Sequence, residues 1–163
     1  MDYIPALARW VHFLAGVMWI GLLYYFNFVQ VPALKDAAAD GTGAGITKHV
    51  APRALLYFRW SAVVTWLAGA TLLGNQFVNA FTFQKGMGAI GIGAWLGTIM
   101  LFNVWALIWP NQQKILGMKP ATDEEKGKAR RVALLASRAN MMLSMPMLFF
   151  MAGGWSHRGT FGL

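Results

Sequence analysis

The chain has 163 residues, of which 57% are apolar and only 12% are charged. Soluble domains carry about 25% charged residues, so the composition excludes an ordinary soluble domain and indicates an integral membrane protein. The net charge of +8 does not indicate nucleic-acid binding, because the basic residues lie mainly in two short segments between apolar stretches.

Four apolar stretches are each long enough for a helix to cross about 30 Å of hydrocarbon, which takes about 20 residues. The sequence therefore predicts an all-α fold: a four-helix transmembrane bundle that forms a single membrane domain over residues 1–163. The first stretch is expected to be retained, because it is too long for a signal peptide and lacks a small-residue cleavage site. In chain order the stretches are residues 10–31, 54–74, 86–110 and 132–155.

The first stretch, residues 10–31, carries one histidine near its start and is predicted to end at Pro32. His12, Gly16 and Trp19 recur at positions i, i+4 and i+7, so one helix face presents an imidazole, a gap and a flat ring. A neutral imidazole can bind haem iron or copper, accept a proton, or hydrogen-bond to a main-chain carbonyl. His12 and Trp19 are therefore candidate cofactor-binding residues, and His12 is the candidate metal ligand.

The distribution of basic residues predicts the orientation of the bundle. Segments 32–53 and 111–131 together contain nine Lys and Arg residues, whereas the opposite side has only Arg9, Lys85 and Arg158. By the positive-inside rule, the two richer segments are cytoplasmic loops. Both termini are then expected on the periplasmic side of a bacterial inner membrane that the chain crosses four times.

The third stretch contains small residues at a spacing of four. Ala89, Gly93 and Gly97 fall on one helix face, a pattern that lets transmembrane backbones approach closely. This face is predicted to pack inside the bundle. Contact with a second copy or with a partner subunit is the alternative, which leaves a homo-oligomer or a hetero-oligomer open.

The fourth stretch is predicted to be the end of a longer helix. Thr122 lies three residues before Glu125, a capping-box pattern that starts a helix before the membrane. The stretch is rich in methionine, which can bind haem iron or copper(I) but more often fills space in helix packing. His157 follows it and is a candidate second cofactor ligand, with solvent exposure as the alternative.

Four polar side chains lie inside the predicted spans, where each is costly without a partner. Asn27, Arg59, Asn103 and Arg138 are predicted at comparable depth near the cytoplasmic side, where they would form one polar layer. No Asp or Glu occurs inside any span, so the anion for the arginines is expected from elsewhere. It could be a lipid phosphate reached by snorkelling, a haem propionate, an acidic partner group, or an anionic or quinone-like substrate.

Three runs of residues resemble a known family: RWVHFLAGVMWIG at 9–21, YFRW at 57–60 and LFNVWALIWPNQ at 101–112. They are similar to the membrane domain at the N-terminus of the membrane-anchored bacterial urate oxidases, also called urate hydroxylases, in which a periplasmic cytochrome c domain follows. The resemblance implies urate oxidation with electrons passed to a c-type cytochrome. This sequence contains no Cys-x-x-Cys-His motif, so we expect that cytochrome to be a separate protein.

Two classes of function agree with these residues. In the first, the chain is a redox membrane protein in which His12 holds haem b or a metal, the polar layer handles an anionic group or substrate, and electrons leave to a separate cytochrome c. In the second, the chain is a non-catalytic accessory subunit that packs against a larger membrane complex and contacts lipids or pigments. Cysteine is absent, which excludes iron–sulfur clusters and thiolate metal sites from either class.

Overall fold

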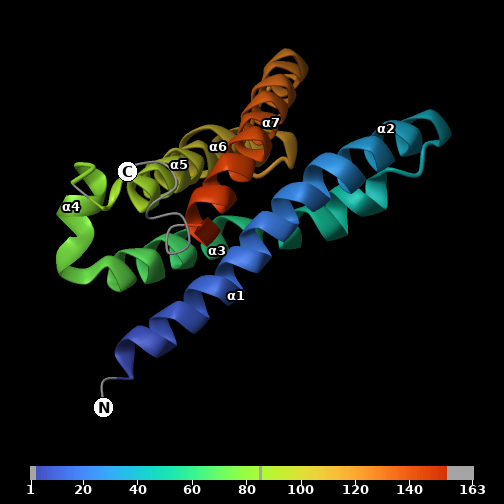
Figure 1. Cartoon of the computed structure of the whole chain (residues 1–163). Helices are drawn as coiled ribbons and strands as arrows, with labels where there is room; N and C mark the ends of the chain where they lie inside the picture. The colour runs from blue at the N-terminus through green and yellow to red at the C-terminus, as the bar shows by residue number, and fades with distance from the viewer. Residues whose placement is uncertain (1–2, 85, 154–163) are drawn as a thin grey trace.

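The computed structural model describes residues 3–84 and 86–153, and the regular elements in these ranges are all helical. Four helical runs within them are long and apolar enough to cross a membrane (Figure 1). The prediction of an all-α protein with four helices of membrane-spanning length is therefore confirmed for this part of the chain. The runs are Ile4–Asp40, Ile46–Phe81, Gly88–Ile115 and Asp123–Ala152.

Three of these runs are built from several helical segments, and in the run Ile46–Phe81 the last short segment turns away after the 3-10 turn Gly74–Gln76 (Figure 1). Three π-helical turns and one 3-10 turn connect the α-helices. In chain order the segments are α1 (Ile4–Tyr25), a π turn (Phe26–Gln30), α2 (Val31–Asp40), a π turn (Ile46–Val50), α3 (Ala51–Leu73), a 3-10 turn (Gly74–Gln76), α4 (Phe77–Phe81), α5 (Gly88–Phe102), a π turn (Asn103–Ile108), α6 (Trp109–Ile115) and α7 (Asp123–Gly153).

Each π turn ends two residues before a proline, namely Pro32, Pro52 or Pro110. Proline has no N–H, and in an α-helix its ring collides with the carbonyl four residues back. The wider π turn moves that carbonyl aside, so the helix continues past the proline. The residue before each proline accordingly donates its N–H to the carbonyl five positions back: Val31 to Phe26, Ala51 to Ile46 and Trp109 to Val104.

The helices consequently extend beyond the predicted spans, and the prediction that Pro32 ends the first helix is wrong. Most of segments 32–53 and 111–131, which were expected to be loops, is helical. The connections between the long runs shrink to residues 41–45 and 116–122. The cytoplasmic location of these connections stays a prediction.

The fourth helix begins before the apolar stretch, as the capping box predicted. The N–H of Thr122 donates to Glu125 Oε2 at 2.7 Å, and the N–H of Glu125 donates to Thr122 Oγ1 at 3.2 Å. These two bonds satisfy main-chain donors that the first turn of a helix leaves without partners. The acidic residues of this turn also match the positive end of the helix dipole.

The helices pack as two antiparallel pairs. In the first pair α1 lies along α3, and in the second pair α5 and α6 lie along α7 (Figure 1). The core forms where the pairs meet, and Leu23, Phe58, Met100 and Val104 are fully buried in it. This arrangement lets polar side chains of the first and third π turns reach α7 inside the bundle.

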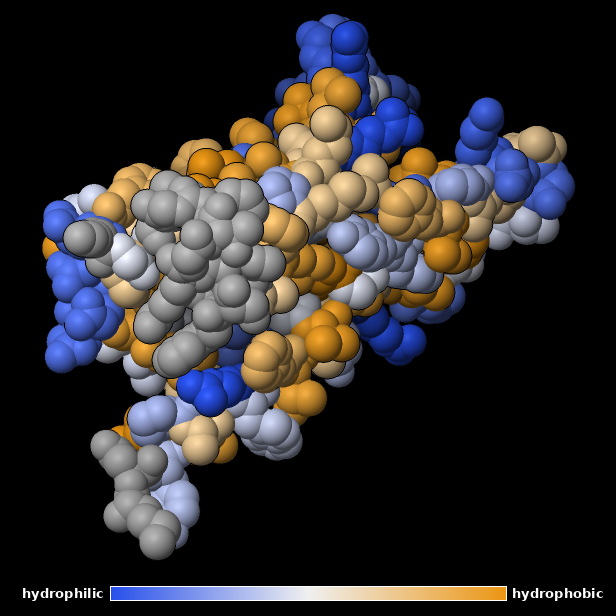
Figure 2. All heavy atoms as spheres, in the orientation of Figure 1, coloured by the Kyte–Doolittle hydropathy of each residue, from blue (hydrophilic) through white to orange (hydrophobic). Residues whose placement is uncertain are grey.

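The outside of the molecule is largely apolar, as a lipid-facing surface should be. Leu7, Trp10, Leu14 and Val17 are exposed and recur at helical spacing along α1. Figure 2 shows hydrophilic residues gathered at the projecting ends of α2 and α7 and hydrophobic residues over much of the surface between the helix ends. Four apolar helices and this surface indicate membrane insertion.

Candidate functional site

His12 is held by α3 through a hydrogen bond to the main chain. Its Nδ1 atom lies 2.8 Å from the carbonyl oxygen of Thr65. A carbonyl can only accept, so Nδ1 carries the proton and donates it. In the neutral ring the lone pair then lies on Nε2, which is the atom available to a metal or to a proton.

Glycine at position 69 makes room for this imidazole. A Cβ atom added to Gly69 would lie 3.0 Å from His12 Cε1 and 3.2 Å from His12 Nδ1. Gly16, one turn after the histidine, also faces α3, because its added Cβ would lie 3.7 Å from Thr65 Cγ2. The histidine ring therefore packs between α1 and α3 and does not lie on an open face.

We expect Gly69→Ala to disturb the packing of the His12 ring against α3. The added methyl group is closer to the ring than an ordinary contact, so the variant should lower the stability by about 1–2 kcal/mol. Gly21→Ala is the matched control, because nothing lies within 4 Å of its added Cβ, and it should be neutral or slightly stabilising.

Thermal unfolding in detergent measures the difference between the two variants. If the collision is with the imidazole, His12→Ala should remove most of the penalty of Gly69→Ala when the two changes are combined. Equal unfolding midpoints for Gly69→Ala and Gly21→Ala would contradict the close packing at His12.

Trp19 lies in the core rather than beside the imidazole. Its side chain is 2% exposed, and its indole N–H has no hydrogen-bond partner in the described part of the chain. The helix face that carries His12, Gly16 and Trp19 is covered within the protein, because His12 and Gly16 face α3 and Trp19 lies in the core. A cofactor-lining role for Trp19 stays a prediction, and His157 lies outside the described residues.

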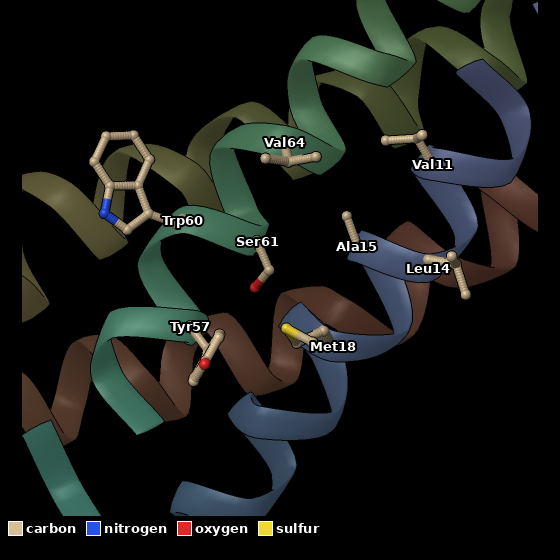
Figure 3. A pocket seen from close by; sticks show the side chains of 8 residues that line it. All are labelled: Val11, Leu14, Ala15, Met18, Tyr57, Trp60, Ser61 and Val64. Carbon is tan, nitrogen blue, oxygen red and sulfur yellow. The ribbon is translucent and has the colours of Figure 1, made fainter. Parts of the chain in front are cut away.

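A shallow groove of about 310 Å³ runs along the seam between α1 and α3 (Figure 3). Its walls are apolar apart from the Tyr57, Trp60 and Ser61 side chains, and the Ser61 hydroxyl already donates to the Phe58 carbonyl at 3.1 Å. The groove therefore suits hydrocarbon better than a polar substrate. Val11 lines one end of it, whereas the His12 ring points to Thr65 and Gly69 instead.

Asn27 lies in the first π turn and binds α7. Its amide nitrogen donates to the Leu23 carbonyl at 2.8 Å and to Ser137 Oγ at 2.9 Å. The side chain thus satisfies both of its donors inside the protein. This explains how an amide is tolerated at this depth without an external ligand.

Asn103 opens the third π turn and binds α7 in the same way. Its amide nitrogen donates to Asn140 Oδ1 at 2.9 Å, and the amide nitrogen of Asn140 donates to the Met100 carbonyl at 2.9 Å. Asn140 is fully buried. Asn27 and Asn103 therefore both bond to the inner face of α7, and the predicted polar layer places them at one depth.

The two arginines of that layer do not join the asparagines. Arg59 is half-buried, and its Cζ atom lies 3.6 Å from the centre of the Trp109 ring, a cation–π contact between α3 and α6. Arg138 is exposed on α7, on a different face from Asn140. Neither arginine forms an ion pair among the described residues, where the pairs found join Lys126 to Asp123 and Lys128 to Glu124.

Sequence reasoning missed the polar stripe on α7 that receives these bonds. Ser137, Asn140 and Ser144 follow one another at helical spacing on the inner face. Ser144 donates to the Met141 carbonyl at 2.6 Å, so the Tyr24 hydroxyl, 3.0 Å away, donates to Ser144 Oγ. Polar residues at i, i+3 and i+7 within an apolar helix were the signal that could have identified the stripe.

Two small residues of α5, Gly91 and Gly93, make close contacts within the chain. Gly93 packs on α7, because a Cβ added there would lie 3.2 Å from Met151 Cγ and Cε. Gly97 is buried with nothing within 4 Å of its added Cβ, and Ala89 is half-buried. The closest approach is at Gly91, outside the predicted spacing, where the added Cβ would overlap the Ala80 carbonyl oxygen.

The described residues thus form an all-helical protein with four helices of membrane-spanning length and apolarity, in which hydrogen bonds between polar side chains join the helices. It belongs to the urate oxidase N-terminal family, whose model matches residues 76–158, just over half of the chain. No curated protein and no solved structure matches it. The family resemblance inferred from the sequence is therefore confirmed, and the chain is a membrane-associated domain related to urate oxidase.

The matched range divides the candidate residues into two groups. Asn103, Arg138 and the α5 glycines lie inside it, whereas His12, Trp19 and Arg59 precede it. The family match therefore says nothing about α1 and α3, and the role of His12 is argued from the structure and from residue chemistry.

Proposed function

We propose that this chain is the redox-active membrane domain of a urate oxidase-type system, in which His12 binds haem b and electrons pass to a separate c-type cytochrome. The observation that carries the proposal is the hydrogen bond from His12 Nδ1 to the Thr65 carbonyl. Histidines that bind metals commonly donate their other ring N–H to a carbonyl or carboxylate, which fixes the ring and leaves the second nitrogen as ligand.

The donor set fits haem better than a bare metal ion. No group of three His, Cys, Asp or Glu side chains that could hold a metal is present among the described residues. A bare ion would therefore lack ligands, whereas a porphyrin brings four nitrogens of its own and needs only one or two protein ligands. His12 would supply one protein ligand, and methionines of α7 or His157 are the candidates for a second.

The protein residues have two tasks in this proposal. His12 offers Nε2, while Thr65 orients the ring through its carbonyl and makes Nε2 more basic. The apolar surroundings exclude water and favour the less charged state of a bound group. Haem b, when bound, supplies a one-electron couple between ferrous and ferric iron, which matches transfer to a cytochrome one electron at a time.

The test is a reduced-minus-oxidised absorption spectrum of the full chain purified in detergent after expression with added haem precursor. His12→Asn is the informative variant, because the Asn amide nitrogen takes the place of Nδ1 as donor to Thr65 while Nε2 is lost. We expect the haem signal and the haem content of the purified protein to fall at least tenfold, while the unfolding midpoint stays equal to that of the haem-free wild-type protein. His49→Ala is the matched control, since His49 is exposed in the second π turn and its loss should leave the haem content unchanged.

A wild-type protein without haem, or a His12→Asn variant with full haem content, would refute the proposal. Haem lost equally in His12→Asn and His49→Ala would also refute it. Iron and copper contents measured on the same samples separate haem from a bare metal.

The exposed face of α1 favours a second candidate, a non-catalytic accessory subunit. Leu7, Trp10, Leu14 and Val17 form an apolar stripe that a helix of a larger membrane complex could cover. This function is expected to tolerate His12→Asn and to be lost when two stripe residues are changed to lysine. Recovery of the complex from native membranes with each variant decides between the candidates.

A further inference from the structure

Arg59 is a cation inside a helix of membrane-spanning length, and no acidic side chain among the described residues pairs with it. Asp and Glu occur only at positions 2, 36, 40 and 123–125, so none lies between residues 41 and 122. No ion pair or hydrogen bond joins the guanidinium to another described residue. A guanidinium carries five N–H donors and cannot lose its charge, so an external acceptor is required.

Trp109 fixes where that acceptor can approach. The indole ring covers one face of the guanidinium at 3.6 Å, so the in-plane N–H groups are free to meet a ligand at the edge. Planar donors held in this way match the paired oxygens of a phosphate or a carboxylate. The contact joins α3 to α6, so the acceptor would sit on the seam between the two helix pairs.

The position of Arg59 favours a lipid phosphate. Arg59 lies eight residues after the start of α3, about 12 Å along the helix, a depth from which an arginine reaches toward the interface. Arg53 is exposed in the first turn of α3, and Lys114 lies in the last turn of α6, so more positive charge lies toward the same helix ends. Basic sites between membrane helices are typical binding places for anionic headgroups.

The surroundings favour a lipid over a soluble phosphate ion. Leu56 and Trp60 on α3 and Leu107 before α6 are exposed apolar side chains within one turn of the contact. A soluble ion would have to cross that surface, whereas a phospholipid covers it with its acyl chains. We infer that Arg59, stacked on Trp109, binds the phosphate of an anionic phospholipid. The lipid belongs to the leaflet on the side where α2 ends and α7 begins.

The test measures lipid binding to the full chain by native mass spectrometry in a mild detergent. The probes are phosphatidylglycerol and phosphatidylcholine with identical acyl chains. We expect the wild-type protein to prefer phosphatidylglycerol and Arg59→Gln to weaken its binding about tenfold. Arg138→Gln is the matched control: it removes the same charge from an exposed site and should change binding less than twofold.

Three results would overturn the inference. One is unchanged phosphatidylglycerol binding in Arg59→Gln, and another is an equal loss in Arg138→Gln, which would reflect net charge alone. The third is displacement of the lipid by millimolar inorganic phosphate, which would assign the site to a soluble ion. If Arg59→Gln does not fold, Arg59→Lys replaces it: the charge stays, the planar fork is lost, and binding should weaken about threefold, with wild-type binding as the contrary result.

Discussion

Gly91→Ala is expected to destabilise the protein by about 3 kcal/mol or more, because the added methyl group would collide with the main chain of a neighbouring segment. The added Cβ would overlap the Ala80 carbonyl oxygen and lie 3.1 Å from Phe83 Cδ1. An oxygen of the main chain cannot rotate away as a side chain can. The helix and the preceding turn would therefore have to separate.

The turn is held in place by other contacts, which is why separation is costly. Ala80 is fully buried, and the indole N–H of Trp95 donates to the Phe81 carbonyl at 3.0 Å. Phe83 adopts a positive φ of 56°, which few residues other than glycine do without strain. Moving the Ala80 carbonyl would break the Trp95 bond and disturb this turn at the same time.

Gly97→Ala is the matched control for Gly91→Ala. Gly97 is buried in the same helix, but nothing lies within 4 Å of its added Cβ, so the change should be neutral or stabilise the helix by about 0.5–1 kcal/mol. Thermal unfolding of the three proteins in one detergent measures both effects. Equal midpoints for the two variants would show that Gly91 does not approach the Ala80 carbonyl this closely.

Asn140→Ala is expected to cost about 1–3 kcal/mol. Asn140 is fully buried and forms two hydrogen bonds with the helix that packs on α7. Its Oδ1 accepts from the Asn103 amide, and its amide nitrogen donates to the Met100 carbonyl. The change leaves the Asn103 amide without its acceptor and removes one of the bonds to the Met100 carbonyl, which still accepts the main-chain N–H of Asn103. In membrane proteins single hydrogen bonds are often worth less than about 1 kcal/mol, so the effect comes mainly from the unpaired Asn103 amide and the cavity.

A double-mutant cycle with Asn103→Ala isolates the bond between the two asparagines. We expect a coupling energy of about 0.5–1.5 kcal/mol, because the double variant no longer strands the amide of Asn103. Ser144→Ala with Asn103→Ala is the control pair, since the Ser144 bonds go to Tyr24 and Met141 instead. Strictly additive effects of Asn103→Ala and Asn140→Ala would contradict the bond.

The overall fold could be predicted from the sequence because its determinants are local and strong. About twenty consecutive apolar residues specify a spanning helix whatever they pack against, and the capping box at Thr122 specifies a helix start by itself. The continuation of the helices past Pro32 and Pro110 could not be predicted in this way. Whether a proline ends a helix or follows a π turn depends on the free energy of the helix beyond it.

The candidate site was predictable only in part, because depth in the membrane is easier to derive than direction around a helix. Asn27 and Asn103 were expected at one depth and do bind the same helix. Arg138 was expected with them, but Asn140, two residues away, faces the interior instead. Two residues rotate a helix by about 200°, and only the packed neighbours determine which side is inside.

The π turns also hold one extra residue each without changing the angular position of the helix that follows. A π turn accommodates one residue more than an α-helical turn, whereas in an uninterrupted α-helix one residue turns the chain by about 100°. Removing one residue from the turn Asn103–Ile108 would therefore restore an α-helical turn and leave Trp109 and the rest of α6 close to their present angle relative to α5. The contact of Trp109 with Arg59 is thus expected to survive a deletion in this turn that would rotate it away in an uninterrupted α-helix.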